Sequence, residues 1–334
     1  MRVVVVGGSG NIGTALLHAM AGSPDFDVVG VSRRAPAVEI PWHEIDISRA
    51  DSDVLLRAAF EAADAVVHLA WLLQPSRNIP RLARTNVDGS RRVFEAALAS
   101  GVRQLVYLSS VGAYSPGPED KAVDESWPTD GVPSSTYSSQ KAAVERMLDL
   151  VAAGDPELTV TRFRPGLVLQ HAAASEIQRY FIGQLAPPAL FDLAARAKLR
   201  LLPLPSHLKL QFVHSSDVAR AIVLALRGNV SGAINLAAPP PLTPRKLARL
   251  TGALHIPMPA GALRALAATS WRLRLQPTEP GWLDLALSVP EMDTTRASTE
   301  LGWQPEHSAQ EAVTALLRGL AEGAGAPTPP LVPR

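Results

Sequence analysis

The first thirteen residues, which contain the run RVVVVGGSGNIG, constrain the fold of this chain more than any other stretch. Four consecutive valines, Val3 to Val6, favour a buried strand because β-branched apolar side chains suit a strand covered on both faces. Glycines follow at Gly7, Gly10 and Gly13, and an apolar helical repeat opens at Ile12. The order strand, glycine turn, helix predicts the first unit of a parallel α/β sheet.

Each glycine of this turn has its own physical use. Gly7 lets the chain turn sharply, Gly10 leaves no Cβ between the backbone and a pyrophosphate, and Gly13 lets helix and strand pack closely. The helix N-terminus then presents free N–H groups and a partial positive charge to the phosphates. We therefore predict a dinucleotide-binding turn, with Asn11 and Ile12 also against the cofactor. The alternative is a glycine-rich turn in some other α/β protein.

Composition sets the broad class. The 334 residues are 47% hydrophobic and 19% charged, which is enough for a substantial core in one large or two ordinary domains. A formal net charge of +1 gives no reason to expect nucleic acid or an acidic membrane as partner. The lack of cysteine excludes disulfides and fits a reducing compartment. With no secretory signal and no uninterrupted apolar span, we expect a cytoplasmic protein without membrane insertion.

Strand and helix patterns alternate through the first half of the chain. Strands are predicted at 3–6, 28–31, 43–46, 65–69, 104–109 and 159–164, and helices at 54–63, 81–100 and 138–153. This alternation predicts an α/β fold, a Rossmann-like doubly wound parallel sheet. Ligands of such sheets bind at the carboxyl ends of the strands, so the residues that follow each strand are the candidates for function.

Two arginines follow the second strand, where an acidic residue would bind the ribose 2′-hydroxyl of NAD. Arg33 and Arg34 instead offer charge and fork geometry to a 2′-phosphate. We predict a preference for NADP(H), with NAD(H) possible; the alternative is that both arginines are solvated loop residues. After the third strand come Asp46 and Ile47, where the carboxylate could accept from an adenine amino group.

The fourth strand ends in His68, followed by Leu69, Ala70 and Trp71. His68 is interpreted as a packed, hydrogen-bonded histidine rather than a catalyst. Ala70 is small enough to let a cofactor pass, and Leu69 lies beside it. Trp71 either belongs to the core or lines the pocket.

A tyrosine and a lysine at Tyr137 and Lys141 lie one turn apart on one helix face. An ammonium so placed would lower the pKa of the phenol, which could then exchange a proton with a substrate oxygen. Ser109 and Ser110 end the fifth strand, and either could hold the same oxygen. The pair alone is common by chance, but its place after a dinucleotide turn and a strand-end Ser-Ser favours catalysis.

These features together resemble the extended short-chain dehydrogenase/reductases, the NAD(P)-dependent epimerase/dehydratase-like proteins. Ser110, Tyr137 and Lys141 match the catalytic set, and Asn86 lies in a segment similar to Asn-Val-x-Gly-Thr. Asp46 and Ile47 match the adenine-contacting pair. Three further segments are similar to the family: 164–166 (Arg-Pro-Gly), 212–219 and 301–305. The resemblance covers nearly the whole chain.

The resemblance implies a Rossmann domain over 1–166, to which 208–238 returns. It also implies a smaller, partly helical substrate domain over 167–322. Residues 323–334 are set aside as a tail, because Leu331 to Arg334 looks like the remnant of a thrombin-cleaved tag. The family's homodimer packs two helices per subunit, which here are 81–100 and 138–153.

The implied mechanism is hydride transfer at the nicotinamide. Tyr137 moves the proton, Lys141 tunes Tyr137 and holds the ribose, and Ser110 orients the oxygen, with Asn86 also in the site. The resemblance places the cofactor against Asn86, Ser109, Tyr137 and Lys141 as well, and against Pro165, Gly166 and Val168 after the sixth strand.

Departures from the family bear on the substrate. Ser110-Val111-Gly112 stands where sugar-nucleotide dehydratases have Thr-Asp-Glu, which argues against 4,6-dehydration. Leu210-Gln211 stands where the epimerases usually have Arg-Asp, and Arg162 to Pro165 lacks their asparagine. Losing a bidentate phosphate clamp should weaken binding of a nucleotide diphosphate, unless Lys209 compensates.

The substrate-side segments are unusually apolar, one near Tyr180 and Phe181 and the other from Leu263 to Trp282. Most of these side chains are core, yet such a surface also suits a lipophilic carbonyl or alcohol. The eight histidines form no zinc motif, and no Gly-x-Ser-x-Gly elbow occurs.

We therefore predict an NAD(P)-dependent oxidoreductase for a non-nucleotide, apolar small molecule, with Tyr137 as general acid/base. One alternative is a sugar or nucleotide-sugar epimerase, and a second is a non-catalytic NAD(P)-sensing protein.

Overall fold

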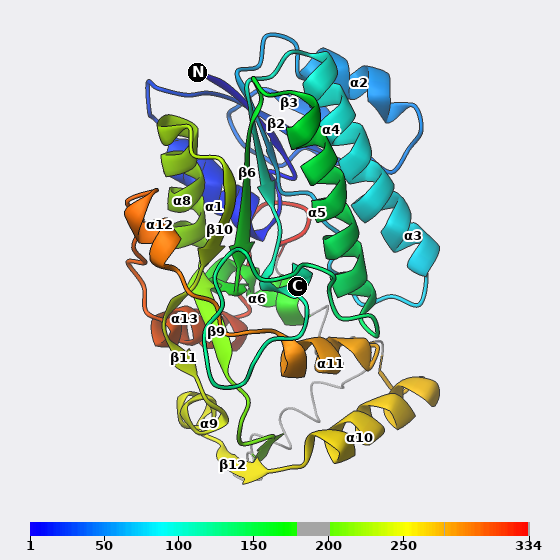
Figure 1. The fold of residues 1–334 in the computed structure, drawn as a ribbon, viewed down its shortest axis with the longest axis vertical. Helices are drawn as coiled ribbons and strands as arrows, with labels where there is room; N and C mark the ends of the chain where they lie inside the picture. The colour runs from blue at the N-terminus through cyan, green and yellow to red at the C-terminus, as the bar shows by residue number, and fades with distance from the viewer. Residues whose placement is uncertain (179–200, 277, 333–334) are drawn as a thin grey trace.

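A computed structural model describes residues 1–178, 201–276 and 278–332 of the chain. Its main sheet has seven strands, all parallel, in the order β10-β6-β5-β4-β1-β2-β3 (Figure 1). The strand order reverses around β1, so the carboxyl ends of β1 and its two neighbours open the crevice that ligands use in such sheets. The strands are β1 (Arg2–Val6), β2 (Asp27–Ser32), β3 (Trp42–Glu44), β4 (Ala65–His68), β5 (Gln104–Leu108), β6 (Thr159–Pro165) and β10 (Gly232–Leu236).

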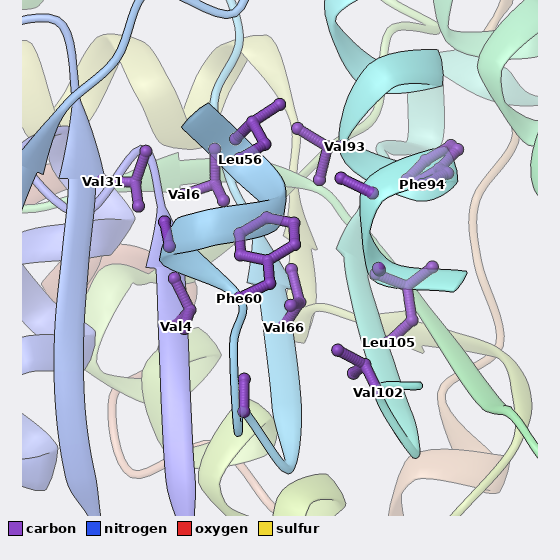
Figure 2. Packing of buried hydrophobic residues seen from close by; sticks show 14 of the residues in the cluster. Val4, Val6, Val31, Leu56, Phe60, Val66, Val93, Phe94, Val102 and Leu105 are labelled. Carbon is purple, nitrogen blue, oxygen red and sulfur yellow. The ribbon is translucent and has the colours of Figure 1, made fainter. Parts of the chain in front are cut away.

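Helices cover both faces of this sheet, as the alternating pattern predicts (Figure 1). One face carries α2 (Ser52–Ala59), α4 (Gly89–Ala99) and α5 (Thr136–Gly154), and the other carries α1 (Asn11–Met20), α8 (Ser215–Gly228) and α12 (Thr295–Thr299). Figure 2 shows the first layer, where Phe60 and Val93 pack on Val4 and Val66 of the sheet. The fully buried side chains of the central strands make this region the main core.

Two predicted helices differ from the observed ones. The helix expected at 81–100 is divided into α3 (Ile79–Ala83), a π-helical turn (Arg84–Asp88) and α4. The π turn places Asn86, 1% exposed, toward the loop after β4, a tertiary contact that no sequence period encodes. The helix expected at 54–63 ends at Ala59, because Ala62 adopts a positive φ of 56°.

The smaller part of the molecule lies beyond the carboxyl ends of the main strands (Figure 1). It contains a sheet of β7 (Leu167–Leu169), β9 (Leu210–His214) and β11 (Ala238–Leu242), and a pair formed by β8 (Leu201–Leu204) and β12 (Leu254–Pro257). Its helices are α6 (Ala174–Ile177), α9 (Pro244–Thr251), α10 (Ala260–Arg272), α11 (Gly281–Ser288) and α13 (Ala309–Glu322). The partly helical second region is thus confirmed. Tyr180 and Phe181 lie outside the described residues.

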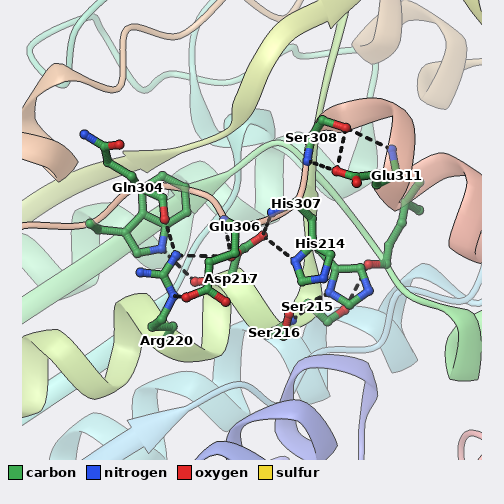
Figure 3. Close-up of polar contacts among 12 residues, drawn as sticks. His214, Ser215, Ser216, Asp217, Arg220, Gln304, Glu306, His307, Ser308 and Glu311 are labelled. Atoms are coloured by element: carbon green, nitrogen blue, oxygen red, sulfur yellow. Dashed lines mark hydrogen bonds and ion pairs between the residues drawn. The ribbon is translucent and has the colours of Figure 1, made fainter.

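The two downstream segments that resemble the family meet at a buried aspartate. Asp217 of α8, fully buried, accepts from the main-chain N–H groups of Glu306 at 2.8 Å and His307 at 3.1 Å (Figure 3). Its main-chain oxygen accepts from Trp303 Nε1 at 2.8 Å. Asp217 therefore fixes the chain before α13 onto α8, and Arg220 of α8 pairs with the same carboxylate at 3.2 Å.

The C-terminal tail packs on the protein as far as it is described. Ser175 donates to the Ala324 oxygen from both its N–H and its Oγ, at 3.2 and 2.6 Å. Leu331 is fully buried. Within the described ranges, no helix is long and apolar enough to cross a bilayer.

Candidate active site

The glycine turn has the geometry of a phosphate cradle. Gly7 has a φ of +89°, and a Cβ there would lie 2.5 Å from the Ala70 nitrogen, so β4 and the turn touch. A Cβ at Gly13 would lie 2.5 Å from the Gly7 oxygen. A Cβ at Gly10 would lie 3.5 Å from its nearest neighbour, the Gly7 oxygen. No side chain caps the first turn of α1. The space and the uncapped N–H groups therefore fit a pyrophosphate.

Asn11 contributes to this cradle through its backbone rather than its side chain. Its Nδ2 donates to the Val168 oxygen at 3.2 Å, and its Oδ1 accepts from Gln170 Nε2 at 2.7 Å and Ser215 Oγ at 2.8 Å. The side chain thus ties the turn to β7 and α8. The main-chain N–H groups of Asn11 and Ile12 lie in the uncapped turn.

The residues predicted to hold the adenosine lie along one edge of the crevice. Arg33 and Arg34 are exposed, and their turn is held by Ser32, whose Oγ donates to the Arg34 oxygen at 2.7 Å. Asp46 Oδ1 accepts from the Ser48 N–H at 3.0 Å, so one of its oxygens is already used. Ile47 is buried beneath Gly89, where a Cβ would lie 2.8 Å from the isoleucine side chain.

Three side chains of α5, one turn apart, form the polar face of the site. They are Tyr137, Lys141 and Glu145. Glu145 is fully buried and accepts from Ser109 Oγ at 2.5 Å and from Arg164 Nε and Nη2 at 2.9 and 2.6 Å. Burial alone would raise the pKa of Glu145, but the hydrogen bonds and charge of Arg164 hold it below its usual value. This carboxylate therefore stays ionised and fixes α5 to β5 and β6.

The Lys141 ammonium forms hydrogen bonds with residues of β5 rather than with Tyr137. Its Nζ donates to the Leu108 oxygen at 2.8 Å and to the Tyr107 hydroxyl at 3.2 Å, and it lies 3.7 Å from the centre of the Trp71 ring. Burial lowers the pKa of Lys141 well below its usual value, against the attraction of Glu145. Trp71 thus contacts Lys141 and also packs against the main core.

The phenol of Tyr137 is protonated at neutral pH. Burial raises its pKa to about 12, and a hydrogen bond with Ser110 opposes that shift. Ser110 Oγ also accepts from the Gly112 N–H at 3.0 Å. The expected lowering of this pKa by Lys141 is wrong here, because the ammonium points to the end of β5 instead of the phenol. A protonated phenol suits the donor of a proton to a carbonyl oxygen.

The side chains of two further predicted site residues, Asn86 and Ser109, form hydrogen bonds with other groups of the protein. Asn86 Oδ1 accepts from the Leu72 N–H at 2.7 Å, and its Nδ2 donates to Gln140 Oε1 at 2.9 Å. Asn86 therefore holds the loop that carries Trp71. Ser109 gives its hydroxyl to Glu145, which leaves Ser110 as the serine beside Tyr137.

The turn after β6 passes close to the smaller sheet. A Cβ at Gly166 would lie 2.5 Å from the Gln211 oxygen, so the position needs glycine for close packing. Pro165 is buried and Val168 half-buried. The backbone of 165–168 thereby runs beside Asn11, at the crevice.

A small, narrow cavity of about 10 Å³, room for about one water, lies beside Tyr137. Five of its lining residues are apolar, and Glu279 is its one carboxylate. Among the described residues, none that lines it is lysine, arginine or histidine. The lining is Leu72, Leu73, Gln74, Pro75, Ser76, Leu82, Asn86, Thr136, Tyr137, Gln140, Glu279 and Trp282.

Gln211 and Lys209, which lie where a phosphate clamp would be expected, both form contacts within the protein. The Gln211 amide accepts from the Met292 N–H at 2.7 Å and donates to the Met292 oxygen at 3.0 Å. Lys209 forms an ion pair with Glu291 at 3.0 Å. Neither side chain presents a free charge to a diphosphate.

Two residues beside Tyr137 and Lys141 have places that were not predicted from the sequence, Glu145 and Trp282. Glu145 had a signal, because it follows Lys141 by four residues on the same helix face. Trp282 had no local signal for its place on Tyr137, where the two ring centres are 4.9 Å apart. In the described ranges, no group of three or more His, Asp or Glu side chains is arranged to hold a metal ion.

Comparisons with known proteins agree on the fold. A family model described as NAD dependent epimerase/dehydratase family matches residues 3–237. A UDP-glucose 4-epimerase of Azospirillum brasilense is 30% identical over 257 residues, which covers 67% of this chain and 68% of that protein. An uncharacterised protein of Mycobacterium tuberculosis is 27% identical over 93% of this chain, which spans 29% of that relative's length.

Solved structures of similar shape are also enzymes of this kind. The UDP-glucose 4-epimerase of Thermotoga maritima, solved with UDP-glucose, has a TM-score of 0.69 at 19% identity, covering 95% of this chain and 98% of the other. The Thermus thermophilus UDP-glucose 4-epimerase, solved with NAD, has a TM-score of 0.68 at 23% identity, covering 96% and 99%. These likenesses support a shared fold.

Proposed function

The chain belongs to the NAD-dependent epimerase/dehydratase family, and from this premise we propose that it moves hydride between a nicotinamide cofactor and a carbonyl or alcohol. Its substrate is an uncharged, largely apolar small molecule. The observation that carries this proposal is the character of the residues around the one-water space beside Tyr137, which are apolar or neutral except for Glu279. An anion there would lose its hydration without gaining a counter-ion.

The residues of the chain divide the chemistry between them. Tyr137 donates the proton to the carbonyl oxygen in reduction, and Ser110, hydrogen-bonded to Tyr137, positions that oxygen. Lys141 of α5, whose ammonium donates to the Leu108 oxygen at the end of β5, holds the cofactor ribose in this proposal. The bound nicotinamide supplies or accepts the hydride. In the reverse direction the phenolate of Tyr137 accepts the proton of the alcohol.

Cofactor choice follows from the turn after β2. Arg33 and Arg34 are exposed and carry no side-chain partner that would neutralise them among the described contacts. We infer a preference for NADPH over NADH from their charge. A titration of wild type and an Arg33→Ser/Arg34→Ser variant with both cofactors tests it. Equal affinities in the wild type would overturn the preference.

The second candidate is an NAD-dependent nucleotide-sugar epimerase. The 30% identity to a UDP-glucose 4-epimerase favours it. The engaged side chains of Gln211 and Lys209 weigh against it, because a diphosphate would have to displace an ion pair or two main-chain hydrogen bonds.

The experiment that separates the two candidates is a product assay. Purified protein is given NADPH or NADH with a panel of neutral aryl and alicyclic ketones, and separately NAD⁺ with UDP-glucose. Oxidation of the cofactor in step with alcohol formation supports the oxidoreductase. Interconversion of UDP-glucose and UDP-galactose without net change of cofactor supports the epimerase.

We also propose a homodimer that packs α4 and α5 of each subunit together. Both helices lie side by side on one outer face of the sheet, and Leu150 of α5 is 75% exposed. Light scattering coupled to size exclusion should give twice the chain mass, and Leu150→Glu should shift it toward the monomer.

A further inference from the structure

One segment of the smaller region, residues 279–284, lies directly on the start of α5. Glu279 Oε1 accepts from the Thr136 N–H at 3.0 Å, and Oε2 accepts from the Thr136 hydroxyl at 3.1 Å. Thr136 is the first residue of α5 and precedes Tyr137. The helix dipole favours a carboxylate at this helix N-terminus. Thr136 thus holds both oxygens of Glu279 by hydrogen bonds.

The segment is seated by backbone contact as well as by charge. A Cβ at Gly281 would lie 2.1 Å from the Ser134 oxygen, so only glycine permits this approach. Asp284 forms a hydrogen bond with Ser134 and a bidentate ion pair with Arg264 of α10, at 2.7 and 3.0 Å. These contacts fix the height of the segment above α5.

This seating places Trp282 on the phenol ring. The ring centres of Trp282 and Tyr137 are 4.9 Å apart with 34° between the planes. Trp71 approaches Tyr137 edge-on from the cofactor side, at 5.9 Å and 77°. Tyr137 therefore lies between two indoles, and Trp282 is also a wall of the cavity.

We propose that Trp282, seated by Glu279 and Gly281, is the residue that determines substrate specificity. Its indole covers the phenol ring and leaves room for about one water beside Tyr137, so it favours the smaller of two uncharged carbonyl compounds whose oxygen must reach Tyr137. Glu279 adds a negative charge to the same wall, which disfavours phosphates and carboxylates. The substrate class rests on the proposed function; the size limit rests on the cavity and the ring contact.

The test measures ligand binding so that it does not depend on turnover. Dissociation constants of acetophenone and 2-acetylnaphthalene are measured by saturation-transfer NMR on protein loaded with NADP⁺. The wild type should prefer the single-ring ketone. In Trp282→Ala the affinity ratio of the two-ring to the one-ring ketone should rise about 10-fold or more, since an indole-sized space opens.

Two further variants guard the interpretation. Gly281→Ala keeps the Trp282 side chain but forces the segment that carries it away from Ser134. It should therefore shift the affinity ratio in the same direction as Trp282→Ala. Trp271→Ala is the matched control, because Trp271 is a tryptophan of α10 that stacks on Arg77 outside the cavity lining. It should leave the ratio within about twofold.

The outcomes separate the inference from the proposed function. An unchanged ratio in Trp282→Ala, an equal shift in Trp271→Ala, or no binding of either ketone to the wild type overturns the inference. Ketones that bind with the predicted size dependence but are never reduced overturn the proposed function alone.

Discussion

The cofactor side and the substrate side of Tyr137 are built on different principles. On the cofactor side, neighbouring strands and α5 supply buried polar groups that pair with one another, such as Glu145 with Arg164 and Ser109. On the substrate side, the contacts are aromatic and come from residues 279–284, far along the chain. The polar groups of the sheet and α5 therefore fix the surroundings of Tyr137 on one side, and a segment distant in the sequence covers its ring on the other.

The largest effect should follow loss of the proton donor shared by both sides. Tyr137→Phe keeps the stacking on Trp282 but removes the hydroxyl, so kcat should fall about 100-fold or more. Cofactor affinity, measured by NADPH fluorescence, should stay within about twofold because the glycine turn is untouched. Full turnover by this variant would show that the phenol is not the acid.

The cofactor side should depend on its buried charges far more than on exposed ones. Glu145→Gln leaves Arg164 buried without its carboxylate, which should cost about 3–5 kcal/mol of unfolding free energy. Asp149→Asn is the control, because Asp149 pairs with Arg162 while 60% exposed and should cost less than about 1 kcal/mol. Urea unfolding measures both; equal losses would mean that the Glu145 network carries no special weight.

His68 gives the cofactor side a sensitivity to acid. Its Nε2 lies 2.8 Å from Ser90 Oγ, and burial lowers its pKa from 6.5 to about 3. Between pH 6.5 and about 3, His68 is therefore protonated in the unfolded chain but neutral in the folded protein. Stability should fall as the pH drops from 6.5 toward 3, by up to about 1.4 kcal/mol per pH unit from this group.

Unfolding of wild type, His68→Gln and the exposed-site control His18→Gln at pH 7, 6 and 5 measures this term. The pH slope should shrink in His68→Gln alone. Parallel slopes in all three proteins would mean that His68 is protonated in the folded state.

The smallest effects are expected in the glycine turn, where one substitution should weaken cofactor binding and another should weaken folding. Gly10→Ala adds a methyl to open space, so stability should change by less than about 1 kcal/mol while NADPH affinity falls about 10-fold. Gly13→Ala places a methyl 2.5 Å from two main-chain oxygens and should destabilise the fold itself. Thermal unfolding with and without NADPH distinguishes the two variants. If Gly10→Ala bound NADPH as tightly as the wild type, Gly10 would not be part of the phosphate cradle.

What could be predicted from the sequence also differs between the two sides. The valine run, the glycine spacing and the Tyr137–Lys141 pair are local patterns; the parallel sheet predicted from the strand and helix patterns is confirmed, and the place of the site stays a prediction. The direction of Lys141 did not follow, since it depends on the Leu108 oxygen and the Trp71 ring. The seating of Trp282 on Tyr137 depends on Gly281 meeting Ser134, a contact between segments with no shared period.

Hydride tracing tests the central claim most directly. Protein is incubated with NADPH or NADH carrying deuterium on either face of nicotinamide C4 and a neutral aryl ketone, and in parallel with NAD⁺ and UDP-glucose. Deuterium on the carbinol carbon of the alcohol, lost in Tyr137→Phe, is the predicted result. Unlabelled ketone together with interconversion of UDP-glucose and UDP-galactose at constant NAD⁺ would contradict it.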